Sequence, residues 1–379
     1  MMHKCLIALL LSCMPAFLQA QTTVNGSLVH GGITRTYSFY VPASYSPGQA
    51  VPLVFNLHGL GTDGEYQAQY RDFRPIADTA GFIVVHPDGS TIFGQRFWNY
   101  GNVLGSTVDD VGFLEALIDT ISAGYTVNPQ RVYCAGMSNG SFMCYYMACQ
   151  SDRFAAIGTV TGSMSVEMYD ECTPQHPIPV LHIHGTDDSV NDYEGTSTMA
   201  GIDEVNQFWV ARNNCNPVPV IIPLPDVNTT DNATATRYLY SGGTNGHTVE
   251  LFKVTGGGHT WPGSPVSGSS GNTCMDFDAC KEIWRFFSQY ERSATAAVTG
   301  KDRVELSIWP NPASTTVTIL TEDNHAVTCV TIYDMQGRVV ENRTGEALHS
   351  IDVHHLETGN YSMQISGDDF TILKKLIIL

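Results

Sequence analysis

A serine between two glycines is the first residue of the sequence whose surroundings predict chemistry. Ser138 stands in Gly136-Met137-Ser138-Asn139-Gly140, directly after the apolar run 131–135 and directly before a stretch with helical character, 141–150. At a strand-to-helix turn of this kind a serine projects its hydroxyl above the sheet, and glycines are needed where side chains would collide. The amides that open the helix favour developing negative charge. We therefore predict that Ser138 is a nucleophile.

Two later loops supply the partners that such a nucleophile needs. A serine hydroxyl requires a base to take its proton, and the base requires a carboxylate to orient it. The run 178–185 leads into a loop with Asp187 and Asp188, and the run 249–258 leads into a glycine-rich loop with His259. Both follow Ser138 in the chain order expected for a nucleophile elbow. We expect His259 to be the base and one of the two aspartates to be its carboxylate.

An earlier loop predicts an oxyanion hole. The run 51–59 ends in His58-Gly59-Leu60-Gly61, where the glycines let the backbone approach a substrate. We expect the amide of Leu60 to be one donor and the amide of Asn139 to be the other. Each donor of this kind typically lowers the barrier by about 3 kcal/mol. This chemistry needs neither a metal nor a cofactor, and we expect none.

Three aromatic residues are candidates for substrate binding. Trp261 lies two residues after His259, Trp98 lies in the segment Gln95–Asn102, and Tyr193 follows the two aspartates. A pocket role is expected for each, with ordinary burial in the core as the alternative.

Other polar residues have structural interpretations. His182 and His184 share a strand face and suggest a metal pair, but hydrogen bonds within the fold are the favoured interpretation. Asp109 and Asp110 are expected to be the N-cap and a first-turn acid of a helix rather than catalysts.

The elements around these residues alternate between two kinds of pattern. Short apolar runs closed by Gly or Pro predict strands at 51–59, 81–87, 131–136, 154–162, 178–185 and 249–258. Helical spacing predicts helices at 108–122, 202–213 and 279–290. The alternation predicts an α/β fold, a mainly parallel sheet with helices on both faces, entered by an antiparallel hairpin at 23–42. After a small-residue linker, 293–303, alternating strands without helices predict a small β-sandwich over 304–379.

Length, charge and the first residues indicate an exported protein. The 379 residues suffice for two domains, and a net charge of −18 argues against a nucleic-acid partner. Residues 1–20 have the apolar stretch and small-residue end of a signal peptide, with lipidation at Cys13 as the alternative. No other segment approaches about 18 apolar residues, so no integral membrane domain is expected.

Eight cysteines remain after removal of the expected signal peptide. Cys149 and Cys172 are candidates for one disulfide, and Cys274 and Cys280 are close enough in sequence to close a small ring. Cys134 is expected to be a free thiol in a buried strand. No C-x-x-C pair is present, which argues against structural zinc and thioredoxin-like redox chemistry.

Five ordered motifs carry a resemblance to a known family. They are "HGLG" (58–61), "VDDVGFL" (108–114), "VNPQRVYCAGMSNGS" (127–141), "HGTDDSV" (184–190) and "GGGHTWPG" (256–263). Together they resemble the secreted polyhydroxybutyrate depolymerase and feruloyl esterase-like branch of the α/β-hydrolases, over roughly residues 25 to 290. The resemblance implies an α/β-hydrolase fold and hydrolysis of carboxylic esters.

The same resemblance assigns roles to individual residues. It implies that Ser138 is the nucleophile, that His259 is the base, and that the carboxylate is Asp188 rather than Asp187. The sequence departs from the pattern in two places: Ser141 stands where the family often has Gly, and no cysteine near Gly243 is available to pair with Cys215.

The C-terminal segments resemble a second known domain. "WPNPASTTVTI", "VTIYDMQGRVV", "LETGNYSMQI" and "KKLIIL" resemble the C-terminal sorting domain of type IX secretion, over about residues 304 to 379. The resemblance implies export, a secreted or cell-surface location, the secretion machinery as a partner, and removal of the domain during export.

The expected protein is a secreted serine esterase with four segments: a signal peptide at 1–20, a catalytic domain at 21–292, a linker at 293–303 and a sorting domain at 304–379. Its substrates would be feruloyl or acetyl esters of carbohydrate, or polyester oligomers of the polyhydroxyalkanoate type. The alternatives are a serine exopeptidase on the same fold and a non-catalytic surface adhesin.

Overall fold

The chain divides into two compact units, Met1–Ser293 and Ala294–Leu379. The computed structural model describes residues 21–265, 270–292, 306–321, 325–334, 338–345, 347–367 and 371–379. The expected signal peptide and the linker 293–303 lie outside the described residues. Within the described part of the chain, no helix is long and apolar enough to cross a membrane.

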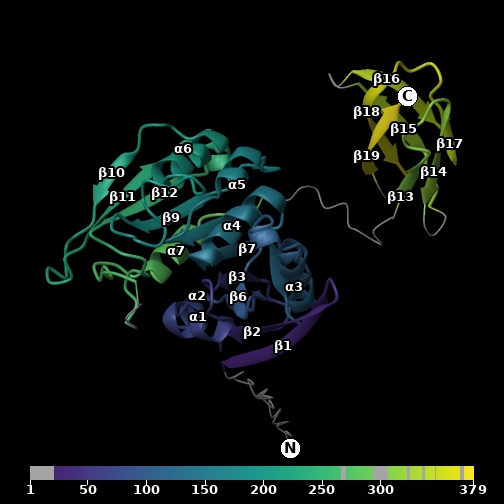
Figure 1. Cartoon of the computed structure of the whole chain (residues 1–379). Helices are drawn as coiled ribbons and strands as arrows, with labels where there is room; N and C mark the ends of the chain where they lie inside the picture. The colour runs from purple at the N-terminus through teal and green to yellow at the C-terminus, as the bar shows by residue number, and fades with distance from the viewer. Residues whose placement is uncertain are drawn as a thin grey trace, which may run out of the picture. The chain divides into compact units, whose positions relative to one another are not determined.

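The first unit is built on one ten-stranded sheet in the order β1-β2-β4-β3-β7-β8-β9-β12-β11-β10 (Figure 1). The six central strands from β4 to β12 pair in parallel, and antiparallel strands complete both edges. The parallel centre confirms the predicted α/β fold. The strands are β1 Thr22–His30, β2 Ile33–Val41, β3 Val51–Leu57, β4 Ile83–Pro87, β7 Val127–Met137, β8 Ala156–Val160, β9 Val180–Gly185, β10 Val220–Pro223, β11 Thr234–Tyr240 and β12 Val249–Thr255.

Helices cover both faces of the sheet, because the central strands are apolar on both faces. Residues of α3, α4, α5 and α6 share one buried cluster, and residues of α1, α2 and α7 share the other. The helices are α1 Gly64–Tyr70, α2 Arg74–Ala80, α3 Asp110–Gly124, α4 Asn139–Gln150, α5 Val166–Glu171, α6 Ile202–Arg212 and α7 Ala279–Phe287. A small hairpin, β5 Ser90–Ile92 and β6 Gln95–Phe97, and two 3₁₀ turns, Val103–Gly105 and Thr244–Gly246, complete the unit.

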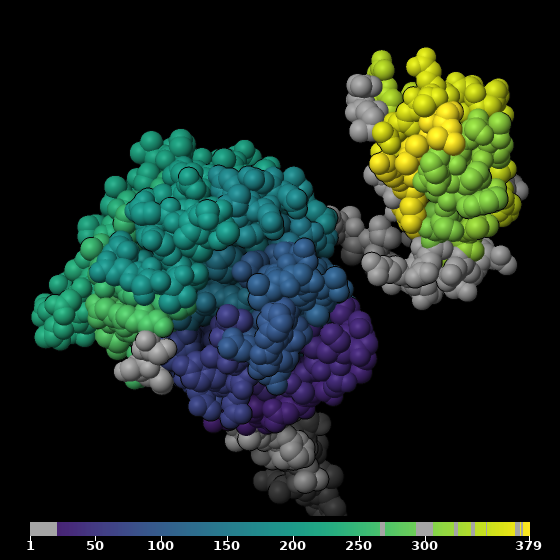
Figure 2. All heavy atoms as spheres, viewed as in Figure 1, coloured from purple at the N-terminus to yellow at the C-terminus, as the bar shows by residue number. Residues whose placement is uncertain are grey.

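The predicted N-terminal hairpin is present and is fastened to α3. Its turn places Gly31 and Gly32 at φ 55° and 78°, a region that favours glycine. His30 lies 2.9 Å from Asp109, whose other carboxylate oxygen accepts from the amide of Gly112 as the N-cap of α3. In Figure 2 the purple atoms of the hairpin border the blue atoms of the α3 region.

The neighbouring aspartate has a larger role than the sequence predicts. Asp110 is buried, forms a 2.7 Å ion pair with Arg35 and accepts from the amide of Asn99. Burial raises its pKa, against the lowering effect of Arg35. Asp110 therefore anchors the segment around Asn99 to the start of α3, in addition to opening the helix.

The second unit contains two antiparallel sheets, in the orders β13-β14-β17 and β16-β15-β18-β19. Side chains from both sheets share one apolar core, as expected for a small β-sandwich. The strands are β13 Leu306–Trp309, β14 Thr316–Thr321, β15 Cys329–Tyr333, β16 Val339–Thr344, β17 Ser350–Asp352, β18 Gly359–Ser366 and β19 Thr371–Ile378.

Candidate active site

Ser138 occupies a strained turn between β7 and α4. Its backbone has φ 54° and ψ −121°, which is unfavourable for a residue with a side chain. A Cβ at Gly136 would lie 2.4 Å from the Gly140 carbonyl oxygen, and a Cβ at Gly140 would lie 2.4 Å from that of Leu57. Only glycine fits at either position. The turn therefore has the geometry of a nucleophile elbow, with the half-buried Ser138 at its apex.

His259 and Asp188 form a hydrogen-bonded pair. The Nδ1 of His259 lies 2.8 Å from the Oδ2 of Asp188, and both residues are buried. Asp187, by contrast, is exposed and accepts from the hydroxyl of its neighbour Thr186. Between the two adjacent aspartates, the structure places Asp188 against the histidine.

The loops that carry this pair are joined by their backbones. A Cβ at Gly185 would lie 2.1 Å from the Gly257 carbonyl oxygen, so glycine is required where the two loops meet. The same carbonyl accepts from the amide of Asp187 at 2.9 Å. These contacts fix the Asp188 loop against the His259 loop.

Ser138 and the histidine–aspartate pair belong to the same edge of the sheet. Strands β7, β8, β9 and β12 are neighbours and parallel, so their carboxyl ends meet at one edge. The amide of Ser138 donates to Val160 at the end of β8, and the side-chain amide of Asn191 donates to Thr161, the next residue. Asn191 in turn donates its backbone amide to Asp188. A short series of contacts thus connects the elbow to the carboxylate.

The carboxylate of Asp188 is held in its ionised form. Burial by itself would raise its pKa, but hydrogen bonds from His184, His259 and the amide of Asn191 outweigh burial and hold the pKa well below its usual range. The amides of Val190 and Asn191 both lie 2.9 Å from Oδ1, and the Nε2 of His184 lies 3.3 Å from Oδ2. An ionised carboxylate is what the imidazole of a catalytic histidine needs for orientation.

Behind Asp188 runs a buried chain of hydrogen bonds that the sequence did not reveal as a whole. The hydroxyl of Thr159 contacts that of Tyr145 at 3.1 Å, and the Tyr145 hydroxyl lies 2.7 Å from His182 Nδ1. His182 Nε2 lies 3.1 Å from His184 Nδ1, and His184 Nε2 lies 2.8 Å from the Asn191 carbonyl. The expectation that the two histidines are hydrogen-bonded within the fold is confirmed.

The donors in this series of hydrogen bonds all point toward the carboxylate of Asp188. Because the carbonyl of Asn191 only accepts, we assign the proton of His184 to Nε2, which leaves Nδ1 as the acceptor. His182 must then donate from Nε2 and accept at Nδ1 from Tyr145. Burial, and then the neighbouring His184, place the pKa of His182 well below its usual value, so this imidazole is neutral. A fixed series of hydrogen-bond donors therefore ends at Asp188.

The loop after β3 is oriented by His58. The Nε2 of His58 accepts from the amide of Gly89 at 2.9 Å, so Nδ1 carries the proton and donates to the Gly59 carbonyl at 2.7 Å. Burial, against the effect of that hydrogen bond, lowers the pKa of His58 to about 4. In a trans peptide the carbonyl and the next amide point in opposite directions. Because His58 holds the carbonyl of Gly59, the amide of Leu60 points away from His58.

The two predicted oxyanion donors are both available. A Cβ at Gly59 would lie 3.5 Å from the Cβ of Ser138, so this loop passes directly beside the serine. In the part of the chain that the structure describes, the amides of Leu60 and Asn139 donate to no acceptor. Asn139 is the first residue of α4, where an amide has no partner within the helix.

Trp98 fastens the same loop to the elbow. Its indole Nε1 donates to the His58 carbonyl at 3.0 Å, and its backbone exchanges two hydrogen bonds with the side-chain amide of Asn139. The indole is fully buried. Trp98 is thus a positioning residue of this site, and the expected substrate contact is not what the structure places there.

The other two aromatic candidates are buried as well. Trp261 packs edge-on against Phe73 in the core below α7 and is 1% exposed. Tyr193 is 3% exposed and donates its hydroxyl to Asp203. Proximity in sequence to His259 and Asp188 did not bring either ring to the surface, so we assign neither to substrate binding.

The cysteines divide into one disulfide and free thiols. Cys149 at the end of α4 is bonded to Cys172 after α5, as predicted, and Cys134 is a buried free thiol. The predicted Cys274–Cys280 ring is wrong, because both are free and buried: Cys280 packs into the core from the first turn of α7. Cys215 is also free.

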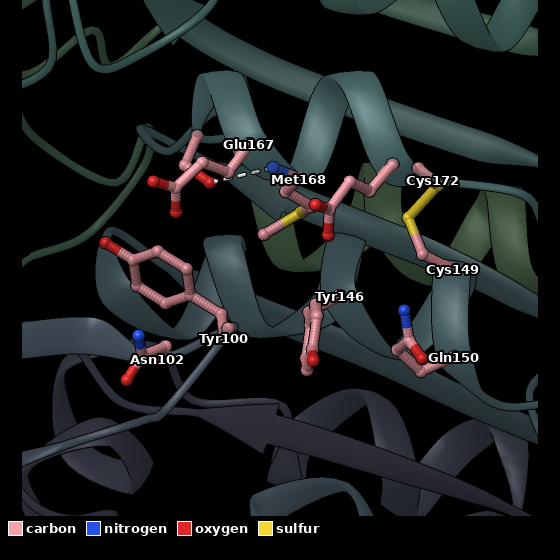
Figure 3. A pocket seen from close by; sticks show the side chains of 11 residues that line it. Tyr100, Asn102, Tyr146, Cys149, Gln150, Glu167, Met168 and Cys172 are labelled. Carbon is pink, nitrogen blue, oxygen red and sulfur yellow. Dashed lines mark hydrogen bonds between the residues drawn. A yellow bond between two sulfur atoms is a disulfide. The ribbon is translucent and has the colours of Figure 1, made fainter. Parts of the chain in front are cut away.

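A cavity of about 410 Å³ opens beside α4. Figure 3 shows Tyr100 and Asn102 at one end, the disulfide at the other, and Glu167 and Met168 of α5 across from Tyr146. Nothing in the sequence predicted this cavity, because three separate segments form it.

Ser141, where the chain departs from the family pattern, is followed by Phe142, which contacts a lining residue of this cavity. Ser141 is buried against Gly162, at which a Cβ would lie 2.4 Å from that of Ser141. Phe142 stacks on Tyr100 with ring centroids 4.8 Å apart. Phe142 thus supports the wall of the cavity through Tyr100.

Comparison with known families matches both units. The model of the prolyl oligopeptidase family matches residues 73–291. The model of the secretion system C-terminal sorting domain matches residues 307–379. The second match confirms the predicted sorting domain of type IX secretion and, with it, a secreted or cell-surface location.

Several named proteins are similar to this chain. A bifunctional acetylxylan esterase/xylanase, XynS20E, of Neocallimastix patriciarum is 26% identical over 283 residues, which are 73% of this chain and 36% of that protein. Feruloyl esterase B of Piromyces equi is 29% identical over 231 residues, 58% of this chain and 41% of that protein. The chain therefore spans less than half the length of either relative. The resemblance to feruloyl esterases is confirmed.

Among solved structures, the chain is matched at low identity to a carbohydrate esterase. The acetyl xylan esterase from Aspergillus awamori gives a TM-score of 0.49 at 14% identity, covering 70% of this chain and 99% of that chain.

Proposed function

The chain belongs to the prolyl oligopeptidase family, and from this premise we propose that it is a secreted serine hydrolase of carboxylic esters. One observation carries the proposal: the strained elbow of Ser138 lies at the same sheet edge as the hydrogen-bonded pair of His259 and Asp188. A serine, an ionised carboxylate and a histidine in this chain order form the constellation for acyl transfer.

In the proposed mechanism, His259 accepts the proton of the Ser138 hydroxyl as its oxygen attacks the ester carbonyl. Asp188 holds the imidazole through Nδ1, so that Nε2 is left to accept the proton. The amides of Leu60 and Asn139 donate to the oxyanion of the tetrahedral intermediate. The imidazolium then gives its proton to the departing alcohol, which leaves an acyl-serine.

Water then hydrolyses the acyl-serine in a second half-reaction, in which it replaces the serine hydroxyl as the nucleophile. His259 takes a proton from water, the hydroxide adds to the acyl-serine carbonyl, and the two amides again stabilise the oxyanion. Collapse of this intermediate releases the acid and returns the proton to Ser138. No step requires a cofactor.

The test of this proposal is Ser138→Ala assayed on a short p-nitrophenyl ester. The expected loss in kcat is about 10⁴-fold or more with folding retained. Labelling of the wild-type protein by a fluorophosphonate, and its loss in the variant, reports the nucleophile directly. An active, folded Ser138→Ala protein would overturn the mechanism, and failure of the probe to label wild-type protein would favour the non-catalytic adhesin.

For the substrate, we propose feruloyl or acetyl esters of carbohydrate. The support is the naming of similar proteins as an acetylxylan esterase/xylanase and a feruloyl esterase. Oligomers of the polyhydroxyalkanoate type need the same machinery and are the competing substrate. Release of ferulate from methyl ferulate, compared with release of 3-hydroxybutyrate from its oligomers, separates the two classes.

A second candidate function is that of a serine exopeptidase, which the name of the matching family favours. Amides and esters are cleaved through the same acyl-serine, so the site itself allows both. Peptide p-nitroanilides assayed beside p-nitrophenyl esters distinguish them: faster turnover of the anilides would replace the esterase proposal.

A further inference from the structure

The cavity beside α4 is a second feature of the first unit that the catalytic steps leave unused. Its lining joins the loop after β6, the outer face of α4 and helix α5, and its volume of about 410 Å³ is in the range of small-molecule sites. The side chains that matter for its chemistry are Tyr100, Asn102, Tyr146, Gln150, Glu167 and Glu171 (Figure 3).

Positions along helix α4 give the distance between this cavity and the nucleophile. The helix begins directly after Ser138, and its rise is about 1.5 Å per residue. Tyr146 and Gln150 follow Ser138 by eight and twelve residues, which places them about 12 and 18 Å along the axis. The Tyr100 end is nearer, because Tyr100 stacks on Phe142, one turn into the helix. A ligand that fills the cavity while its ester lies at Ser138 is therefore longer than a simple ester.

The opposite wall also begins beside the nucleophile. Strand β8 neighbours β7, and a Cβ at Gly162, just after β8, would lie 2.8 Å from the Ser138 carbonyl oxygen. The chain then runs through Ser165, whose side chain accepts from the amide of Met168 as the N-cap of α5. Both walls thus begin beside Ser138 and lead away from it, and the cavity lies between them at the distances given above.

The lining has the functional groups that bind a neutral saccharide. Tyr100 and Tyr146 offer aromatic faces on which the C–H faces of a sugar ring can stack. Asn102 and Gln150 offer amides, and Glu167 and Glu171 offer carboxylates, as partners for hydroxyl groups. The lining residues of this described cavity include no lysine or arginine. The two carboxylates of the lining disfavour acidic sugars and phosphates.

The walls are fixed without a ligand, which favours binding. The disulfide between Cys149 and Cys172 ties the end of α4 to the end of α5. On the other side, the side chain of Asn99 accepts from the amide of Val103 and donates to the carbonyl of Val108. The loop with Tyr100 and Asn102 is thereby held from both of its ends.

We propose that this cavity binds the neutral polysaccharide chain to which the scissile acyl group is attached, so that the ester is chosen by its position on an extended saccharide. The proposal rests on the proposed esterase function. It predicts that substrates gain affinity as the saccharide lengthens, while hydrolysis of small synthetic esters makes no use of the cavity.

The experiment compares Tyr146→Ala with the matched variant Tyr238→Ala, which removes a half-buried tyrosine of β11 outside the cavity. Each is assayed on acetylated xylo-oligosaccharides from xylobiose to xylohexaose and on p-nitrophenyl acetate. For Tyr146→Ala we expect KM for the longest substrate to rise about tenfold, as for loss of one stacking contact. The kcat values and p-nitrophenyl acetate hydrolysis should not change. Tyr146→Phe, which keeps the ring, should retain most of the affinity.

Binding of unesterified xylohexaose to Ser138→Ala, measured by calorimetry, tests the cavity without catalysis. Binding that Tyr146→Ala abolishes supports the proposal even when no ester tested is cleaved, so failure of the esterase function is distinguishable from failure of the cavity. Absence of binding, a KM independent of saccharide length in the wild type, or equal losses for Tyr146→Ala and Tyr238→Ala would overturn the proposal.

Discussion

The two units of the chain differ in what they bury. Among the described residues, all but one of the buried polar or charged side chains lie in the first unit, and the exception in the second is Thr331. The C-terminal unit encloses an apolar core. Burying polar groups is costly unless each finds partners. A unit that holds a reactive site needs buried polar side chains despite this cost. A sorting domain is recognised through its surface and does not need them.

The largest effect is expected from a substitution of the buried carboxylate, Asp188. Asp188→Asn should lower kcat by about 10⁴-fold, because an amide cannot stabilise the imidazolium and favours the wrong tautomer of His259. The exposed Asp187→Asn is the matched control and should change kcat by no more than about twofold. Steady-state kinetics on a p-nitrophenyl ester measures both. Equal losses in the two variants would show that the roles of the adjacent aspartates are wrongly divided.

The two units should differ in how much stability they lose at acid pH. Burial lowers the pKa of His58 to about 4 and, together with Arg74, that of His86 to about 3, whereas an unfolded histidine titrates near 6.5. Between these values the unfolded chain binds more protons than the folded one, so the stability from each neutral histidine is complete above pH about 6.5 and is lost as the pH falls. His58 alone should cost about 3 kcal/mol by pH 4.

No described histidine of the C-terminal unit is buried, so that unit lacks this source of acid sensitivity. Hydrogen exchange followed by mass spectrometry at pH 7 and pH 4 resolves the two units in one sample. We expect protection to be lost first in the central strands of the catalytic unit. Earlier loss in the C-terminal strands would contradict the assignment of the buried histidines as neutral.

A smaller effect is expected at the histidine behind the carboxylate. His184→Phe removes the proton that faces Asn191 and Asp188 and should lower kcat about tenfold, as for loss of one hydrogen bond near a charge. His184→Gln, which restores a donor, should recover part of the rate. The downfield proton resonance of the His259–Asp188 hydrogen bond should shift in the first variant. An unshifted resonance with reduced rate would indicate a general packing defect instead.

The smallest effect is expected from removing the second unit. A chain that ends at Arg292 retains every residue of the proposed catalytic machinery and should keep kcat/KM within about twofold. Its secretion, measured by its distribution between cell and medium, should be lost. A large loss of kcat/KM in the purified, folded truncated protein would show that the units are not independent in function.

Local patterns sufficed to predict the reactive residues and the elements that carry them. Ser138, His259 and the aspartate loop each follow an apolar strand, and the position of a residue at the end of a parallel strand largely determines where it lies in this fold. The sequence also predicted one disulfide correctly.

The surroundings of the site depend on contacts between distant segments and were not predictable in the same way. Tyr145 of α4 meets His182 of β9 only because the fold brings these distant segments together, and no local pattern reports that contact. Trp261 follows His259 by two residues but turns into the core. Cys274 and Cys280 are near each other in sequence, yet Cys280 belongs to the first turn of a helix that buries it.

The backbone of Ser138 has a consequence for how this protein can change. At φ 54° and ψ −121° a glycine would be relaxed, whereas a residue with a side chain costs of order 1–3 kcal/mol. Ser138→Gly should therefore yield a more thermostable but inert protein. Stability and turnover are opposing selective pressures at this one position, and a laboratory selection for heat resistance alone would be expected to remove the nucleophile.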